Sequence, residues 1–228
     1  MTSNLLTIFV FLIYFCCSTI SGTPQLYCLG GQNENGKASF SVSQLNTTDN
    51  KWKDSNRMST AKYDFGATVI GKKIYVCGGN SGDGLLKLLE VYDCEKNNWT
   101  ELAPMEDARD LFGMAALNKS IYVAGGSDAS NKRKLKSVMK YSPEKNTWSE
   151  VKPMNEGREG HMLVALDDSI YAIGGYESKT VERYSPLIDK WSFVASTRYE
   201  YSYFGATAHQ NKIYILSNRS FEVFDPET

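Results

Sequence analysis

The sequence predicts an all-β protein built as a short array of repeated four-stranded units, and three observations predict it. The motif Ile-Tyr-Val-Cys-Gly-Gly at 74–79 recurs with small changes at 121–126 and 170–175, and more divergent copies occur at 26–31 and 213–218. The first glycines of the pairs fall at 30, 78, 125 and 174, so units repeat every 47 to 49 residues, a period typical of repeat architectures. In each of the first four units a tryptophan follows a tyrosine or leucine after a constant gap of seven residues.

The elements within a unit follow a fixed order, which is clearest at 58–104. A small, apolar run at 66–70 predicts the first strand, and the motif at 74–79 predicts the second, ending in the glycine pair. An alternating segment ending at Tyr92 predicts the third strand, and the segment around Trp99 predicts the fourth after a polar turn. Short strands separated by turn residues indicate a meander of antiparallel strands.

Two sets of residues are expected to hold the units together. Glycine permits positive φ and close backbone approach where the chain leaves the second strand. Tryptophan is large enough to fill the wedge between neighbouring units while its N–H reaches the backbone. The glycine pairs are Gly30 and Gly31, Gly78 and Gly79, Gly125 and Gly126, and Gly174 and Gly175, and the tryptophans are Trp52, Trp99, Trp148 and Trp191.

The units share a glycine pair after a strand, then a tyrosine, a tryptophan, and Pro-Met followed by Arg. With these residues, the sequence from Thr23 to Thr228 resembles the kelch repeat. The resemblance implies an all-β, kelch-type β-propeller of four-stranded blades. Eighteen strands are counted, and the last unit stops in the turn at 225–228, so we expect a partial propeller of four to five repeats, truncated at the C-terminus. The expected repeats run roughly over 23–57, 58–104, 105–153, 154–196 and 197–228.

The N-terminal segment is almost continuously apolar from Leu5 to Cys17 and is followed by small residues. This pattern is typical of a secretory signal peptide, assigned to 1–22, with cleavage after Ser21 or Gly22. No Lys or Arg precedes the apolar run, so an uncleaved membrane anchor and a wrongly assigned start remain alternatives. A cleaved signal predicts a secreted protein that does not contact a membrane, and a wrong start predicts a cytoplasmic one.

Composition argues against several classes of function. With 25 basic and 26 acidic residues the net charge is −1, so no global field favours nucleic acid or an anionic membrane. The two histidines, His161 and His209, and the lack of a paired-cysteine motif argue against a metal centre, and no cofactor is expected. Outside the apolar segment, Cys28, Cys77 and Cys94 lack the spacing of a disulfide framework and are expected to be unpaired.

Four N-glycosylation sequons fall in predicted turns, as accessible acceptors require. Asparagine is also favoured in turns for its own local hydrogen bonds, so the triplets support secretion only weakly. The candidate acceptors are Asn46, Asn98, Asn118 and Asn218.

Lys62, Arg109 and Arg158 occupy the same place in successive units, ten residues after the tryptophan, and Tyr201 takes the fourth such place. The register puts them where the outer strand of one blade crosses to the innermost strand of the next, so we expect them to surround one mouth of the central channel. Arginine suits bidentate capture of carboxylates or phosphates. In the kelch adaptors that this sequence resembles, these crossovers contact partner peptides. The alternative is that each group pairs with a local carboxylate or carbonyl.

A second candidate contact lies in the loop after the third glycine pair, which carries Lys132, Arg133 and Lys134, with Lys136 close by. A run of charges in a loop is usually solvated. The more specific interpretation is a contact with an acidic partner.

No nucleophile elbow or phosphate-binding loop occurs, so no catalytic residue is assigned. The resemblance implies a non-enzymatic module that presents loops to a protein partner, with actin or a substrate of a cullin ubiquitin ligase as the partners known for kelch-like adaptors. The BTB and BACK domains of those adaptors are not found in the sequence, which puts ligase recruitment in doubt. Two alternatives stay open: a fragment of an intracellular adaptor, and a secreted enzyme on the same scaffold.

Overall fold

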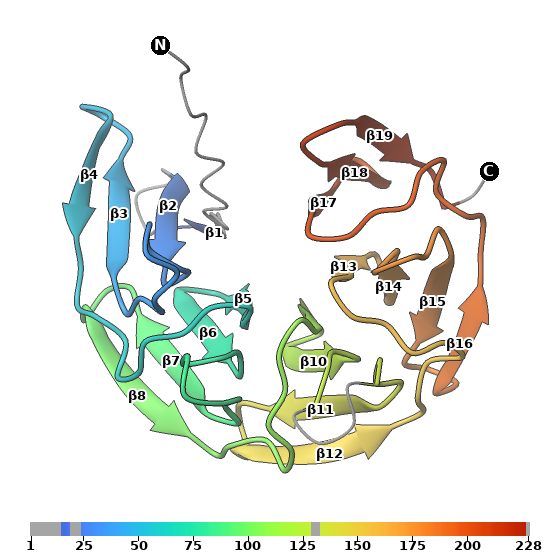
Figure 1. The fold of residues 1–228 in the computed structure, drawn as a ribbon, viewed down its shortest axis with the longest axis horizontal. Helices are drawn as coiled ribbons and strands as arrows, with labels where there is room; N and C mark the ends of the chain where they lie inside the picture. Colours follow the sequence, from blue (N-terminus) through green and yellow to red (C-terminus); the bar gives the residue numbers. More distant parts are fainter. Residues whose placement is uncertain (1–14, 19–23, 129–132, 227–228) are drawn as a thin grey trace.

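The computed structural model describes residues 15–18, 24–128 and 133–226. In these residues the protein is all-β, with nineteen strands in five antiparallel sheets. Four sheets have four strands and the last has three, and strands that are neighbours in a sheet are consecutive in the chain. Figure 1 shows the sheets as blades side by side in an open arc, with blades 1 and 5 at its ends. The predicted propeller is confirmed.

The strands are assigned to the blades as follows. Blade 1 has β1 (Phe15–Ser18), β2 (Pro24–Leu29), β3 (Val42–Asn46) and β4 (Lys51–Asp54). Blade 2 has β5 (Gly66–Ile70), β6 (Lys73–Cys77), β7 (Leu89–Asp93) and β8 (Asn98–Leu102). Blade 3 has β9 (Gly113–Leu117), β10 (Ser120–Ala124), β11 (Val138–Ser142) and β12 (Thr147–Val151). Blade 4 has β13 (Met162–Leu166), β14 (Ser169–Ile173), β15 (Val181–Ser185) and β16 (Lys190–Phe193), and blade 5 has β17 (Gly205–His209), β18 (Lys212–Leu216) and β19 (Phe221–Phe224).

The strand that the sequence count did not include is β1. It pairs antiparallel with β2, from Phe15 opposite Tyr27 to Ser18 opposite Pro24. This strand lies inside the predicted signal peptide at 1–22, whose other residues are outside the described part of the chain. An apolar run rich in aromatic and β-branched residues suits a strand as well as a leader. Cleavage after Ser21 or Gly22 would remove β1 and leave blade 1 with three strands.

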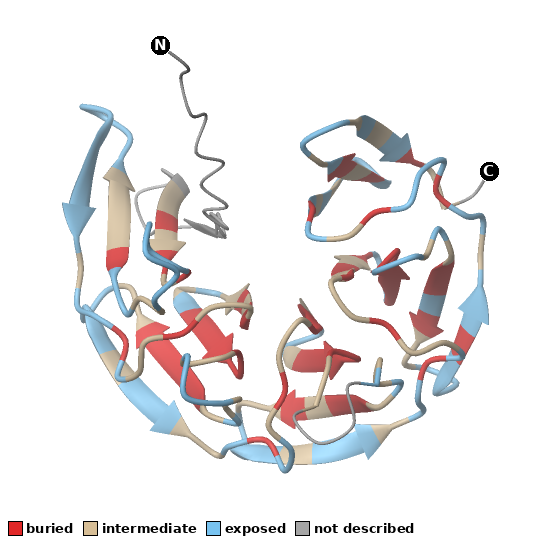
Figure 2. Cartoon of the chain, viewed as in Figure 1, coloured by how far each residue is buried: buried red, intermediate tan, exposed pale blue. Residues whose placement is uncertain are grey.

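Apolar side chains fill each of the four interfaces between consecutive blades. In the second strand of a blade an isoleucine packs against the preceding blade, while the adjacent tyrosine packs against the following one, because side chains alternate across a strand. Figure 2 shows burial concentrated in the inner strands and exposure in the outer ones. The repeated pairs are Ile74 and Tyr75, Ile121 and Tyr122, and Ile170 and Tyr171; in blade 5, Ile213 packs against blade 4 in the same way.

A three-residue hydrogen-bonded clamp joins the outer edges of neighbouring blades. In blade 3, Asn146 Oδ1 accepts hydrogen bonds from Tyr141 OH (2.7 Å) and from the Ala103 backbone N–H (2.8 Å) of the preceding blade. Trp148 Nε1 donates to Ala103 O (2.8 Å). Asn97 and Asp189 make the corresponding bonds in blades 2 and 4. Trp52, in the first blade of the arc, is instead 45% exposed.

Candidate functional site

One end of the propeller, here called the loop face, carries the connections after the glycine pairs, at 78–88, 125–128, 133–137 and 174–180, together with the crossovers between blades. Backbone bonds join loop and crossover: Gly126 N donates to Arg158 O (2.7 Å), and Arg158 N donates to Leu135 O (3.0 Å). Gly126 has a φ of 92°, and a Cβ there would lie 2.4 Å from Asp110 O. Glycine is therefore required for this close approach.

The four residues expected around the channel mouth point inward instead. Lys62 is 0% exposed, and Arg109, Arg158 and Tyr201 are each 1% exposed. The expectation of a surface ring is wrong, because the backbone bonds under each loop turn these side chains into the blade. The structure thus places these four side chains inside the blades.

Each of these side chains reaches the second residue of the third strand in its own blade. Lys62 Nζ forms a buried ion pair with Glu90, and Arg158 Nη2 lies 3.0 Å from Glu182 Oε1. A buried charge needs such a partner to offset its loss of hydration. The structure thus shows the local pairing that was the alternative from sequence. The equivalent pairs are Lys62 with Glu90, Arg109 with Met139, Arg158 with Glu182, and Tyr201 with Glu222.

Blade 3 departs from this pattern because Met139 stands in place of the glutamate. Arg109 donates from Nη1 to Gly125 O (3.1 Å) and Ser137 Oγ (3.1 Å), and from Nη2 to Met139 Sδ (3.8 Å). Its Nε has no hydrogen-bond partner among the described residues. Burial lowers the pKa of Arg109, although Asp107 and Asp128 act in the opposite direction.

Blade 4 departs at another position, where His161 takes the place of a phenylalanine. Phe65, Phe112 and Phe204 occupy the equivalent sites three residues after Lys62, Arg109 and Tyr201. His161 is 3% exposed, and neither ring nitrogen has a hydrogen-bond partner among the described residues. Burial, and then the positive charge of Arg158, lower the pKa of His161 to about 3.

A chain of backbone hydrogen bonds runs around the centre of the arc, just before each innermost strand. Leu111 N donates to Asp64 O (3.0 Å), Gly160 N to Leu111 O (2.8 Å), and Tyr203 N to Gly160 O (3.1 Å). All four residues have positive φ, between 52° and 62°. These four residues, at equivalent places in four blades, are thus linked by backbone hydrogen bonds into part of a ring around the centre, here called the ring segment.

The groups beside this ring segment are acidic. Burial, and then the nearby Asp110, raise the pKa of Asp64 to about 6. Burial also raises the pKa of Asp110, and Glu159 adds to this effect. The pKa of Tyr203 is raised by burial and then by the charge of Asp64. A partner group that reaches the centre of the loop face therefore meets negative charge.

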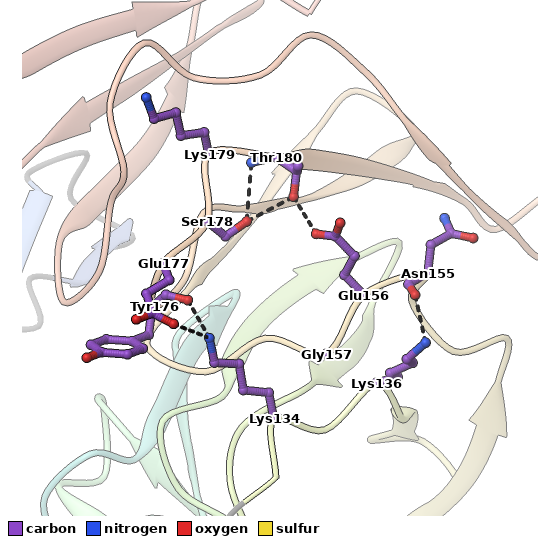
Figure 3. Close-up of a pocket in the computed structure, with 10 residues that line it drawn as sticks. All are labelled: Lys134, Lys136, Asn155, Glu156, Gly157, Tyr176, Glu177, Ser178, Lys179 and Thr180. Carbon is purple, nitrogen blue, oxygen red and sulfur yellow. Dashed lines mark hydrogen bonds and ion pairs between the residues drawn. The ribbon is translucent and has the colours of Figure 1, made fainter.

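A hollow of about 490 Å³ opens off-centre on the loop face, between blades 3 and 4 (Figure 3). It is lined by two loops and one crossover, so three separate segments build it. Of the predicted basic loop, Lys134 lines the hollow and Arg133 is exposed next to it, while Lys132 lies outside the described residues. The lining residues are Lys134, Lys136, Asn155, Glu156, Gly157, Tyr176, Glu177, Ser178, Lys179 and Thr180.

Other candidate sites give little chemistry. Within the described ranges, no group of three His, Cys, Asp or Glu side chains could hold a metal ion, and no helix could cross a membrane. Cys28, Cys77 and Cys94 form no disulfide among the described residues, and burial raises the pKa of Cys77 to about 12, which makes it a poor nucleophile at neutral pH. The four sequon asparagines are exposed, and their glycosylation stays a prediction.

Comparison with known proteins gives the family. The model described as "KLHDC2/KLHL20/DRC7 Kelch-repeats domain" matches residues 14–175, and a "Kelch motif" model matches residues 157–198. The chain belongs to the kelch-repeat family. The first match begins at residue 14, so it includes β1 as well as the glycine pairs of blades 1 to 4.

Similar curated kelch proteins cover only part of the chain. Kelch-like protein 41a of Danio rerio is 40% identical over 76 residues, which are 33% of this chain and 13% of that protein. Kelch-like protein 40 of Xenopus laevis is 34% identical over 76 residues, 33% of this chain and 12% of that protein. A putative F-box/kelch-repeat protein of Arabidopsis thaliana is 35% identical over 69 residues, 30% of this chain and 19% of that protein. The matched segments thus span less than a fifth of these relatives.

Two features of the kelch loop face were not found from the sequence, although signals for both exist. The acidic partners of Lys62, Arg158 and Tyr201 share one register, at Glu90, Glu182 and Glu222. The exposed lysines that precede the third strand also share a register, at Lys87, Lys136 and Lys179. The shape of the hollow has no such signal, because it depends on how loops of different length meet.

Proposed function

We propose that the chain is a non-enzymatic protein-interaction module that presents its loop face to a protein partner. Membership of the kelch-repeat family supports the general role. The observation that carries the proposal is the hollow between blades 3 and 4, where exposed and half-buried charged side chains from three segments converge. Binding residues are commonly found on loops that a rigid scaffold positions.

The chemistry of the described residues supports binding rather than catalysis. Catalytic acids and bases usually combine a shifted pKa with access to substrate. His161 has the shifted pKa, but it is enclosed in the core and has no hydrogen-bond partner there. The enzyme alternative therefore has no site that favours it.

For location, we propose secretion directed by the segment 1–22, and this proposal has a consequence for the structure of blade 1. If the segment is cleaved, blade 1 must persist without β1. If the segment is retained, as an intracellular adaptor related to actin-binding or ligase-associated kelch proteins would require, β1 completes the blade. Intact mass of the protein from its source distinguishes the two: a start at residue 22 or 23 supports secretion, and retention of residues 15–18 contradicts a cleaved leader.

The binding proposal is tested by proximity crosslinking in the native source, with variants on opposite ends of the propeller. Lys134→Glu with Lys136→Glu changes the loop face, while Lys145→Glu changes the exposed β11–β12 turn at the other end. We expect crosslinked partners to be lost in the first variant and kept in the second. Equal capture by both variants and the unchanged protein would refute the role of the loop face.

A further inference from the structure

The hollow between blades 3 and 4 carries a specific charge arrangement. We propose that it binds an acidic segment of a protein partner, with carboxylates directed at Lys134 and Lys136 and the segment lying off-centre on the loop face. The inference rests on the function proposed above and adds the chemical class of the ligand. It follows from which charges in the hollow are free and which are already engaged.

The lysines of the hollow are held in position without being neutralised. Lys134 Nζ donates to Tyr176 O (2.6 Å) and lies 5.0 Å from the centroid of the Tyr176 ring. The one carboxylate within ion-pair distance among the described residues is Glu177 Oε2 at 3.9 Å, and an exposed pair at that distance contributes little. Lys136 Nζ donates to the neutral Asn155 O (2.9 Å). Each ammonium has three donors, so both keep capacity for an incoming carboxylate.

The half-buried acid of the hollow, by contrast, is engaged within the blade. Glu156 Oε2 accepts a hydrogen bond from Thr180 Oγ1 (2.6 Å) and lies 3.3 Å from Arg158 Nη2. Figure 3 shows this carboxylate directed at Thr180 and away from Lys134. Glu156 thus shares Arg158 with Glu182 and contacts neither Lys134 nor Lys136 in the described residues. The three lysines that line the hollow, Lys134, Lys136 and Lys179, outnumber its two lining carboxylates, Glu156 and Glu177, which leaves positive charge for a ligand.

The equivalent position on blade 2 shows that this arrangement is local. Lys87 has the register of Lys136, and its carbonyl accepts a hydrogen bond from Met105 N (2.8 Å), as Lys136 O does from Met154 N (3.0 Å). Leu85 stands where blade 3 has Lys134, and the exposed acids Glu106 and Asp107 lie in the crossover. Lys87 is therefore a matched control with the same backbone setting and a different charge balance.

The size of the hollow and the field around it favour a peptide segment over a small anion. A volume of about 490 Å³ accommodates several side chains, whereas a single phosphate or carboxylate fills a small part of it. Tyr176 is 50% exposed and offers an aromatic surface beside the lysines. The acidic centre, with Asp64 and Asp110, repels a negatively charged segment and so directs it outward to blades 3 and 4.

The test uses the full chain and a fluorescein-labelled hexaglutamate peptide, with hexaglutamine as the neutral comparison, and measures fluorescence anisotropy at low and physiological salt. We expect hexaglutamate to bind and hexaglutamine not to bind. Combining Lys134→Glu with Lys136→Glu should weaken binding by about tenfold or more, and Lys87→Glu by less than about twofold. Weakening with rising salt should accompany the specific binding.

Three results would overturn the inference. They are equal binding of both peptides, equal losses from the Lys87 and the Lys134/Lys136 variants, and displacement of hexaglutamate by an equal concentration of inorganic phosphate, which would indicate a site for free anions. If hexaglutamate fails to bind while crosslinking in the source still depends on the loop face, the ligand class is wrong and the interaction module stands. If crosslinking is also independent of the loop face, both proposals fail.

Discussion

Blades 3 and 4 have the same strand order and equivalent clamps, but each lacks one feature that the other keeps. Blade 4 pairs its buried Arg158 with Glu182, whereas blade 3 offers Arg109 only neutral acceptors and Met139. At the neighbouring core position, blade 3 has Phe112, whereas blade 4 encloses an unpartnered His161. In the described residues the repeat thus accommodates a buried arginine without a carboxylate in the third strand in one blade, and an imidazole without a hydrogen-bond partner in the next.

The largest effect is expected when blade 4 is given the defect of blade 3. Glu182→Met removes the buried carboxylate of Arg158 and leaves it only the half-exposed Glu156 among the described residues. It also removes the acceptor for Asn155 N (2.7 Å) and Glu156 N (3.1 Å). Removing one member of a buried ion pair typically costs about 3–5 kcal/mol. We expect a clear fall in the urea midpoint for unfolding, measured by tryptophan fluorescence.

The control for this variant is Glu150→Met, which replaces an exposed glutamate on β12. Surface changes of this kind usually alter stability by within about 0.5 kcal/mol. If Glu182→Met is no more destabilising than the control, blade 4 does not depend on its ion pair, and the two blades differ less than the structure indicates.

A smaller effect, with the opposite sign, is expected when blade 3 is given the feature of blade 4. Met139→Glu places a carboxylate in the register of Glu182, where it can accept from the unpartnered Nε of Arg109. A hydrogen bond to a charged group contributes about 1.5–3 kcal/mol, from which the cost of burying the carboxylate is subtracted. We expect a gain of about 1–2 kcal/mol in the free energy of unfolding, read from the same urea curves.

Met139→Gln is the matched control, because it offers a similar acceptor without charge. A gain from glutamate and not from glutamine would show that Arg109 lacks a counter-charge. Equal gains would show that it lacks only an acceptor. Destabilisation by both would mean that Met139 packs too tightly for a polar side chain at this position.

The fold could be predicted from the sequence because each contact that recurs in the blades requires a particular type of residue. The close approach of loop and crossover at Gly126 admits no Cβ. The clamp needs an aromatic donor at Trp148 and a turn residue that tolerates positive φ at Asn146, where φ is 51°. These requirements recur at a fixed spacing, so the repeat could be recognised without any knowledge of tertiary contacts.

The direction of the basic side chains could not be predicted in the same way. Register located Arg109 and Arg158 correctly in the crossovers, but the sequence says nothing about the bonds from Arg109 N to Leu86 O (3.2 Å) and from Arg158 N to Leu135 O (3.0 Å) that turn them inward. The glutamates in the third strands were the missing signal. β1 was missed for another reason, since an apolar run serves equally as a leader and as a strand.

The smallest effect at neutral pH is expected from His161→Phe, which gives blade 4 the aromatic residue of blade 3. The change removes two unsatisfied ring nitrogens from the core, and we expect a gain of about 1 kcal/mol at pH 7. Acid should enlarge the difference. The pKa of His161 in the folded protein is about 3, against an ordinary value of 6.5. Below pH 6.5 the His161 imidazole therefore binds a proton in the unfolded chain but stays neutral in the folded chain. The free energy of unfolding falls by up to about 1.4 kcal/mol per pH unit until pH 3.

Asp64 acts in the opposite direction, because its raised pKa of about 6 makes the folded state gain stability as pH falls toward 3.8. Urea curves of the unchanged protein and of His161→Phe, measured side by side at each pH, cancel this contribution. We expect the two proteins to diverge steadily from pH 6.5 downward. Parallel curves would mean that His161 reaches solvent or a proton acceptor before the blade unfolds. In that case the unpartnered imidazole would not be the weakness that distinguishes blade 4 from blade 3.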